Sequence, residues 1–236
     1  ETSVDVGVTE TGSTQIGESL QLSGSGYTYG AFTWTGPKTE TPGLANKGQF
    51  LYPVVEFDVA SQTVNEAGGS VDIAVKILNP DGQTVSVDVV FQQNNSTAEA
   101  EDFISSTSQT ITFGPTVHEG DIQNASFSLA NDSNYEGAET AEFLLTNVST
   151  SGTSKIDGQT DFVLTIEDDE VPVVVINEIH ADPDPEAGNA DGDNEINSDD
   201  DEFVEIVNGE SVSVDISNWT ISDETGVQFT FDSGTI

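Results

Sequence analysis

The acidic stretch Thr165-Ile166-Glu167-Asp168-Asp169-Glu170 has the residue types and spacing that most directly suggest chemistry. Neighbouring carboxylates repel, and each raises the pKa of the next unless a cation neutralises them. Many oxygen ligands in a short space suit a hard cation, and calcium is the first candidate. The stretch also separates two different sequence patterns. We therefore expect a calcium-filled hinge between two domains.

A second acidic group comes earlier in the chain. Asp132, Glu136 and Glu139 follow an apolar run that ends at Leu129, much as the first group follows a run that ends at Ile166. If these two strands run parallel in space, both groups emerge at one end of a domain, where they could supply the roughly 6–8 oxygens that calcium takes. The alternative is a polar loop whose acids are simply solvated.

Residues 189–200 form a third acidic segment, with the alternating oxygen ligands of an EF-hand or dockerin loop. Asn194 stands where glycine is expected at the sharp turn, and asparagine tolerates the left-handed conformation better than most residues. A solvated acidic loop is again the alternative. The expected calcium ligands are Asn189, Asp191, Asp193, the backbone carbonyl of Glu195, and Asp200.

Composition limits the classes of partner. The chain has 43 acidic residues, four lysines and no arginine, for a net charge of −39. It therefore lacks the basic surface that binding to nucleic acid or anionic membrane requires. The absence of cysteine excludes disulfides and thiol catalysis. No apolar run reaches the roughly 20 residues of a membrane span. We expect the chain to be an internal fragment of a longer protein.

The acidic groups must be positioned by strands, because apolar and polar residues alternate along much of the chain and helical periodicity is absent. Residues 71–77 and 85–91, joined by Asn79-Pro80-Asp81-Gly82, predict a hairpin. About seven short strands within 53–170 predict an antiparallel β-sandwich. Trp34 and Trp219 are expected in cores. Further strands are expected at 19–22, 31–34, 111–113, 125–129, 141–145, 161–166, 173–176, 203–207, 212–216 and 219–221.

Four separated elements carry a resemblance over residues 53–170: the segments at 64–69, 100–103, 131–140 and 165–170. Together they resemble the Calx-β family of immunoglobulin-like calcium modules. Asn131 stands where that family often has aspartate. The resemblance implies that calcium ligands gather at one end of the sandwich. It places them on Glu66, Asp102, Asp132, Glu136, Glu139, Asp168, Asp169 and Glu170.

The flanking segments resemble parts of another immunoglobulin-like fold. The segments 175–180, 201–208 and 214–223 make residues 171–236 similar to the opening part of a lamin-tail domain. The segments 17–22, 32–34 and 41–46 make residues 1–48 similar to its closing part, as found in secreted Bacteroidetes proteins. The resemblance implies an all-β chain of three domains. It also suggests that the two halves are completed by missing sequence or by neighbouring copies, through strand complementation.

Catalysis is not indicated. The sequence contains neither Gly-x-Ser-x-Gly nor a phosphate-binding glycine loop. His180 beside Asp182 is a candidate for metal or acid–base chemistry, but a histidine at a strand end is the simpler interpretation. We expect a non-catalytic, calcium-rigidified structural or adhesive module of an extracellular or bacterial cell-surface protein. The alternatives are an accessory region of a secreted nuclease or other hydrolase, and a carbohydrate-binding module.

Overall fold

The computed structural model describes residues 6–150, 154–181, 189–190, 192–196 and 201–234, and the regular secondary structure of this part is almost entirely β. By internal contacts the chain divides into two compact units, Glu1–Asn131 with Thr140–Ile166, and Asp132–Glu139 with Glu167–Ile236. No helix in the described ranges is long and apolar enough to cross a membrane. The helical segments described are single 3-10 turns: η1 (Tyr29–Ala31), η2 (Glu66–Gly68), η3 (Gln93–Asn95) and η4 (Ala100–Asp102).

The N-terminal strands form a three-stranded sheet in the order β2-β1-β3. The strands expected at 19–22 and 31–34 correspond to β1 (Glu18–Gly26) and β2 (Phe32–Thr39), which pair antiparallel. β1 also pairs parallel with β3 (Gln49–Leu51), a strand that the sequence did not predict. Of the apolar side chains in this sheet, Phe32 is buried, whereas Tyr29 and Phe50 are exposed. Phe32 is the one buried apolar side chain among the described residues of this sheet.

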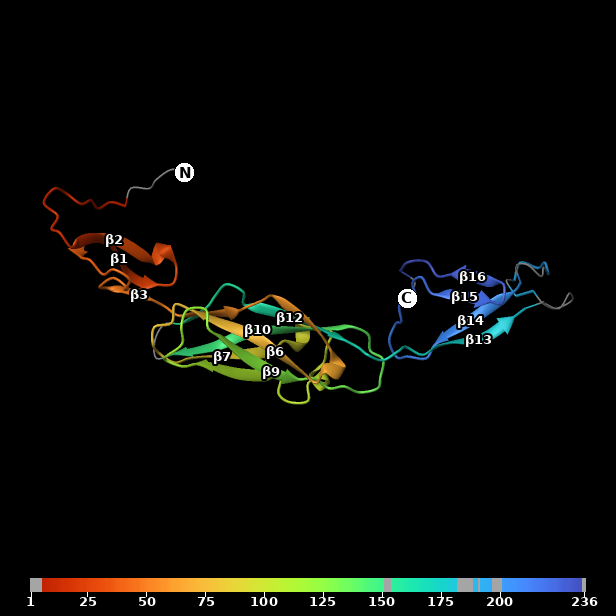
Figure 1. Cartoon of the computed structure of the whole chain (residues 1–236). Helices are drawn as coiled ribbons and strands as arrows, with labels where there is room; N and C mark the ends of the chain where they lie inside the picture. Colours follow the sequence, from red (N-terminus) through yellow and green to blue (C-terminus); the bar gives the residue numbers. More distant parts are fainter. Residues whose placement is uncertain (1–5, 151–153, 182–188, 191, 197–200, 235–236) are drawn as a thin grey trace. The chain divides into compact units, whose positions relative to one another are not determined.

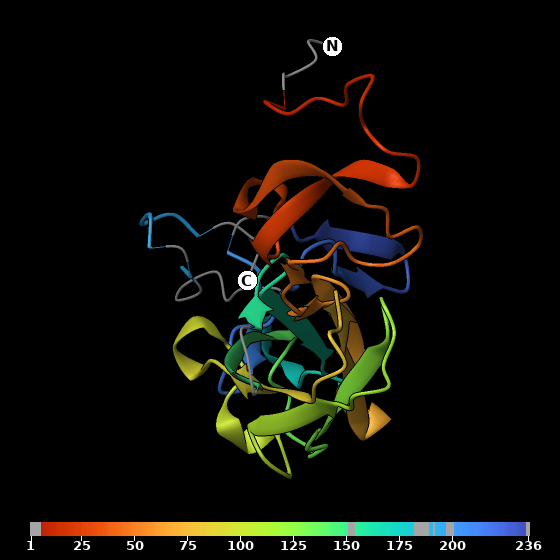
Figure 2. The ribbon, with the colours of Figure 1, turned by 90° about the vertical axis from the view of Figure 1, so that its left-hand side faces the viewer.

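The centre of the chain is an immunoglobulin-like β-sandwich, as predicted. Its strands run roughly across the view in Figure 1 and toward the viewer in Figure 2. One sheet has the order β5-β12-β10-β7-β8 and the other the order β11-β4-β6-β9. The strands of the first sheet are β5 (Ser61–Asn65), β12 (Asp161–Glu167), β10 (Glu139–Thr150), β7 (Val85–Phe91) and β8 (Ser108–Phe113). Those of the second are β11 (Lys155–Ile156), β4 (Val54–Phe57), β6 (Ser70–Leu78) and β9 (Ile122–Ser128).

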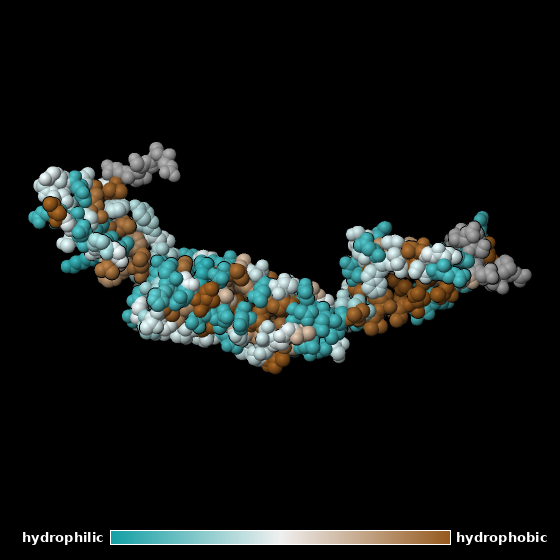
Figure 3. Space-filling view, viewed as in Figure 1, coloured by the Kyte–Doolittle hydropathy of each residue, from teal (hydrophilic) through white to brown (hydrophobic). Residues whose placement is uncertain are grey.

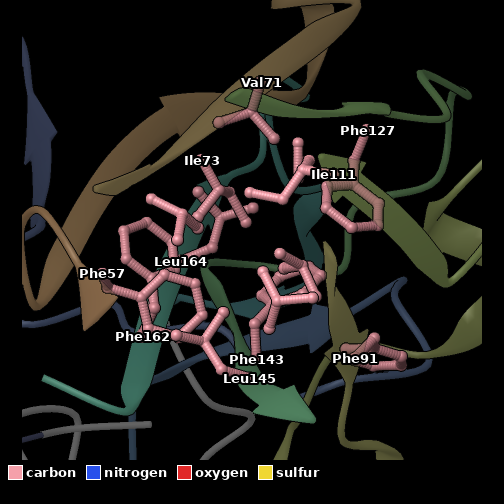
Figure 4. Packing of buried hydrophobic residues seen from close by; sticks show 14 of the residues in the cluster. Phe57, Val71, Ile73, Phe91, Ile111, Phe127, Phe143, Leu145, Phe162 and Leu164 are labelled. Atoms are coloured by element: carbon pink, nitrogen blue, oxygen red, sulfur yellow. The ribbon is translucent and has the colours of Figure 1, made fainter. Parts of the chain in front are cut away.

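The sandwich core follows from strict alternation. β7 buries every second residue, and β6 does the same, because successive side chains on a strand point to opposite faces. Phe143 lies at the centre of the cluster in Figure 4, with its ring 4.7 Å from that of Phe127 and 5.8 Å from those of Phe91 and Phe103. This aromatic packing fixes the two sheets that carry the acidic loops.

The expected hairpin between residues 71–77 and 85–91 is wrong. The turn is present, with positive φ at Asn79 (50°) and Gly82 (79°). However, β6 pairs with β4 and β9, whereas β7 pairs with β8 and β10 in the opposite sheet. Stacked sheets lie roughly 10 Å apart, a gap that the loop between these strands crosses. Both strands bury one apolar face in the common core. Which strands they form hydrogen bonds with depends on other parts of the chain, not on the turn that joins them.

The C-terminal part contains two separate hairpins. β13 (Val174–His180) pairs with β14 (Phe203–Asn208), and β15 (Thr220–Asp223) pairs with β16 (Gly226–Thr230), a strand that the sequence did not predict. The strand expected at 212–216 does not form. Side chains there bind the backbone instead: Asn208 donates to the Val212 carbonyl at 2.8 Å, and Asp215 accepts from the Ser217 N–H at 2.8 Å. Such bonds compete with strand pairing.

Candidate metal centre

Glu66 is held at the end of β5 by the turn η2. The side chain of Asn65 accepts a hydrogen bond from the Ala67 N–H at 3.0 Å, and Gly69 closes the turn with a left-handed φ of 73°. Glu66 is 9% exposed. A buried carboxylate is costly to ionise unless other groups compensate. Because β5 and β12 are neighbours in one sheet, the ends of these strands can bring Glu66 and Asp168 together.

Glu66 forms an acidic group with two residues that follow β12. One carboxylate oxygen from each of Glu66, Asp168 and Glu170 lies within 4.8 Å of the other two. Oxygens on opposite sides of a calcium ion are roughly 4.8 Å apart, because each bond is about 2.4 Å long. The spacing therefore suits three ligands of a single ion.

Asp168 organises this group through its own hydrogen bonds. It accepts the backbone N–H groups of Glu136 and Gly137, both at 2.6 Å, and of Glu170 at 2.8 Å. Burial opposes ionisation of Asp168, but these three hydrogen bonds outweigh it and hold its pKa below the ordinary value. Asp168 therefore remains a carboxylate and ties the loop at 136–137 to the end of β12.

Glu170 has the opposite electrostatics. Burial, a side-chain hydrogen bond with Asp168 and the charges of Asp169 and Asp168 together raise its pKa. Its Oε2 atom is buried and has no hydrogen-bond donor. A buried carboxylate oxygen without a donor fits a metal ligand, since a cation would satisfy it and offset the neighbouring charges. The residues present thus match the donor chemistry of calcium.

A second group of three carboxylates comprises Asp102, Glu136 and Glu139, whose oxygens also lie within 4.8 Å of one another. Asp102 is fixed at the end of η4, where its carboxylate accepts the Glu99 N–H at 2.6 Å and its carbonyl accepts the Ala130 N–H at 2.8 Å. Glu139 is the first residue of β10. Asp168 binds the backbone of Glu136, and the two groups are therefore linked.

The structure thus brings together six of the ligands that the Calx-β resemblance implies. Two more, Asp132 and Asp169, belong to neither group. Asp132 instead accepts hydrogen bonds from the backbone and side chain of Asn134, at 2.7 and 3.0 Å. It acts as a turn-forming residue, a common alternative use of aspartate in loops.

The EF-hand-like loop is described only in part, because Asp191 and Asp200 lie outside the described residues. Asn194 has the expected left-handed φ, 73°. Asn189 and Asp193 make local turns, accepting from Gly192 N–H at 2.6 Å and Glu195 N–H at 2.7 Å. The Glu195 carbonyl, an expected ligand, accepts from the Asn189 side-chain amide at 3.0 Å. Calcium binding at this loop stays a prediction.

Sequence reasoning missed one acidic residue beside this loop. Asp201 is 1% exposed and accepts the Ala190 N–H at 2.7 Å. It stands in a run of four acids from 199 to 202, and such a run carries no alternation that distinguishes a buried member from solvated ones. The only sequence signal was its position just before the strand at 203–208.

The structure also places the histidine considered for catalysis and the two tryptophans expected in cores. His180 stacks on Phe203, with ring centroids 5.4 Å apart, as a strand-end histidine does. The expectation that Trp219 is a core residue is wrong, because 42% of it is exposed. Trp34 is half-buried and its Nε1 donates to the Tyr29 hydroxyl at 2.8 Å.

Comparisons with known proteins bear on the lamin-tail and Calx-β resemblances. A family model for the lamin tail domain matches residues 168–236, which supports the resemblance of the C-terminal part. The curated proteins contain no match. The apo-form Calx CBD1 domain is similar at 23% identity and a TM-score of 0.43, over 50% of this chain and 98% of that one.

Two further solved structures are similar to the chain. The calcium binding domain CBD12 of CALX1.1 has 24% identity and a TM-score of 0.43, over 52% of this chain and 48% of that one. A two-domain protein of unknown function from Bacteroides fragilis has 9% identity and a TM-score of 0.37, over 55% and 54%. The chain thus spans about half the length of each of these two proteins.

Proposed function

We propose that this chain is a non-catalytic, calcium-binding structural or adhesive module of an extracellular or bacterial cell-surface protein. The observation that carries the proposal is the group Glu66, Asp168 and Glu170, with the Glu170 Oε2 atom buried and without a donor. Carboxylates so close to one another repel unless a cation lies among them. The group Asp102, Glu136 and Glu139 would hold a second ion.

Calcium at these positions would act on stability rather than on reactivity. The ion binds the folded chain and stabilises it by mass action, by about 2.7 kcal/mol per site when calcium is at one hundred times its dissociation constant. Because Asp168 and Glu170 lie where the sandwich continues into residues 171–236, the ion would also stiffen that junction. Calcium modules outside cells typically bind weakly, with dissociation constants of roughly 10⁻⁴–10⁻³ M, which suits a permanently loaded support.

The decisive experiment compares thermal unfolding in calcium and in chelator for the native chain and for Glu170→Gln. Calcium should raise the melting temperature of the native chain by on the order of 10 °C. Glu170→Gln should abolish most of this rise. In chelator it should stabilise the protein, because it removes a charge that has no compensating partner.

The matched control is Glu167→Gln, which removes one charge three residues earlier, from an exposed side chain outside both acidic groups. This variant should keep the full calcium response. Equal melting temperatures of the native chain in calcium and chelator would contradict the proposal. So would an equal loss of response in the two variants, since that would indicate a general effect of charge.

A further inference from the structure

The C-terminal part of the chain exposes an unusual amount of apolar surface. Among its described residues, Val214 and Ile216 are buried, whereas Ile176, Ile179 and Phe229 are each more than half exposed. In Figure 3, apolar atoms gather over β13 and β14. A groove of about 250 Å³ runs between the hairpins. It is lined by Val174, Val175, Ile176, Ile206, Trp219, Ile221 and Phe231, among others.

Such a surface is not stable alone in water. Isolated two-stranded sheets are marginal, and large contiguous apolar patches on soluble proteins mark interaction sites. The two hairpins also belong to separate sheets, β13-β14 and β15-β16, so each has unpaired edges that another strand can extend. The groove therefore fits a β-structured apolar partner.

The N-terminal sheet has complementary features. It exposes Tyr29, Leu44 and Phe50 at 66%, 77% and 63%. A hollow of about 620 Å³ on this sheet is lined by two of the four lysines in the chain, Lys38 and Lys47, and by one acid, Glu18. Gln21 also lines it: this side chain is 2% exposed, and its Oε1 atom has no donor. A docked acidic peptide can supply the carboxylates that attract the lysines.

Charge identifies where such a peptide would come from. Residues 171–236 contain 17 aspartates and glutamates and neither lysine nor arginine. Complementary charge steers association and disfavours wrong pairings. The exposed apolar face and the acidic surface thus occur together at one end of the chain, while exposed apolar side chains and paired lysines occur together at the other.

We propose that the N-terminal sheet, β1 to β3, docks on the C-terminal part of a second copy of this chain, covering the apolar groove and placing Lys38 and Lys47 against its acids. Repetition of the contact gives a head-to-tail assembly, because a contact between two different surfaces leaves each copy with one free surface; the assembly is a ring if the rotation closes and an open filament if it does not. This inference goes beyond calcium binding and uses neither of the two groups of three carboxylates.

The test is analytical ultracentrifugation at constant calcium. The native chain should associate with rising concentration beyond its 24.9 kDa monomer, and added salt should weaken the association. Lys38→Glu/Lys47→Glu should weaken it at least tenfold. Lys155→Glu is the matched control, since Lys155 is an exposed lysine in β11 outside the hollow, and it should have little effect.

A mixing experiment establishes the head-to-tail arrangement. A second variant, Ile176→Ser/Trp219→Ser, alters only the apolar groove. Each variant alone should stay monomeric, whereas a mixture of the two should form a dimer through the one intact pair of surfaces. The proposal is overturned if the native chain is monomeric at all concentrations, or if the lysine variant still dimerises alone. Unchanged association in both variants would overturn it as well, and circular dichroism verifies that each variant is folded.

Discussion

At the scale of single residues, Asp168 and Glu170 are close in sequence but differ in their hydrogen bonding. Asp168 is satisfied by three backbone N–H groups, which keep it ionised without any metal. Glu170 is left with a buried oxygen that has no donor. In the proposed site, the first residue therefore builds the loop and the second is the one that would respond to an ion. A mutation at Asp168 would damage the loop itself, and Glu170 is the sharper probe of binding.

This division predicts a specific pH dependence in calcium-free buffer. The pKa of Glu170 is raised above its ordinary 4.5, chiefly by burial and by the neighbouring Asp168. Its contribution to stability is fully present below the unfolded pKa and is lost as pH rises through the raised folded pKa. Urea unfolding measured across this window should show that loss, and Glu170→Gln should remove it.

Asp168 gives the opposite sign at lower pH. Its pKa is lowered below 3.8 by the backbone hydrogen bonds, which outweigh burial. Its contribution is present above the unfolded pKa and is lost as pH falls through the folded pKa. The pH range in which the Asp168 contribution is lost therefore lies below the range in which the Glu170 contribution is lost. A stability profile that is identical in the native chain and in Glu170→Gln would contradict the assignment of charge strain to Glu170.

At the scale of elements, the sequence predicts strands well where alternation is strict. The runs at 85–91 and 161–166 correspond closely to β7 and β12, because alternation is a local property of a strand with one buried face. Pairing is not local. β6 and β7 were assigned to one hairpin and lie in different sheets, since the partner of a polar edge depends on strands elsewhere in the chain.

The acidic sites show the same limit. Glu139 and Asp168 were expected close together because both follow strands whose ends could meet, whereas Glu66 was expected from the Calx-β resemblance alone. Each of the three lies in a group of three carboxylates. Asp132, an expected ligand, lies outside both carboxylate groups, and the buried Asp201 was not singled out from the sequence. An aspartate in an irregular loop serves equally as a ligand, a turn former or a buried acceptor. Which of these it becomes depends on backbone N–H groups that the sequence does not position.

The central element of the sandwich gives a direct stability prediction. Phe143 is fully buried among aromatic rings from both sheets, so Phe143→Ala should destabilise the sandwich by about 3–5 kcal/mol through lost burial and an unfilled cavity. Val163→Ala, at a 37% exposed position of β12, should cost far less. Both tryptophans lie outside the sandwich, and circular dichroism is therefore the suitable probe. Equal effects of the two substitutions would contradict the core assignment.

At the scale of the whole molecule, a net charge of −39 is itself a force on the fold. Self-repulsion destabilises compact states and is screened by any salt. Only two ion pairs between lysine and an acid are described, both made by Lys76, with Glu56 at 3.1 Å and Asp58 at 3.6 Å, so internal compensation is small in the described part of the chain. A cation could therefore stabilise this protein generally, by screening, or locally, by coordination.

A comparison of ions separates these two effects. Melting temperatures should be measured in sodium, magnesium and calcium chloride at matched ionic strength. If screening alone acted, the melting temperature in sodium chloride would be nearly as high as in the other two salts. The melting temperatures in magnesium and calcium chloride would then be equal. Coordination predicts a calcium-specific rise, because calcium accepts irregular sets of carboxylates, whereas magnesium demands near-octahedral geometry and dehydrates reluctantly. Glu66→Gln should remove this excess for calcium and leave the sodium response unchanged. If the three salts gave equal thermal unfolding curves, the acidic residues would be a solvated surface. The two groups of three carboxylates would then have no role as metal ligands.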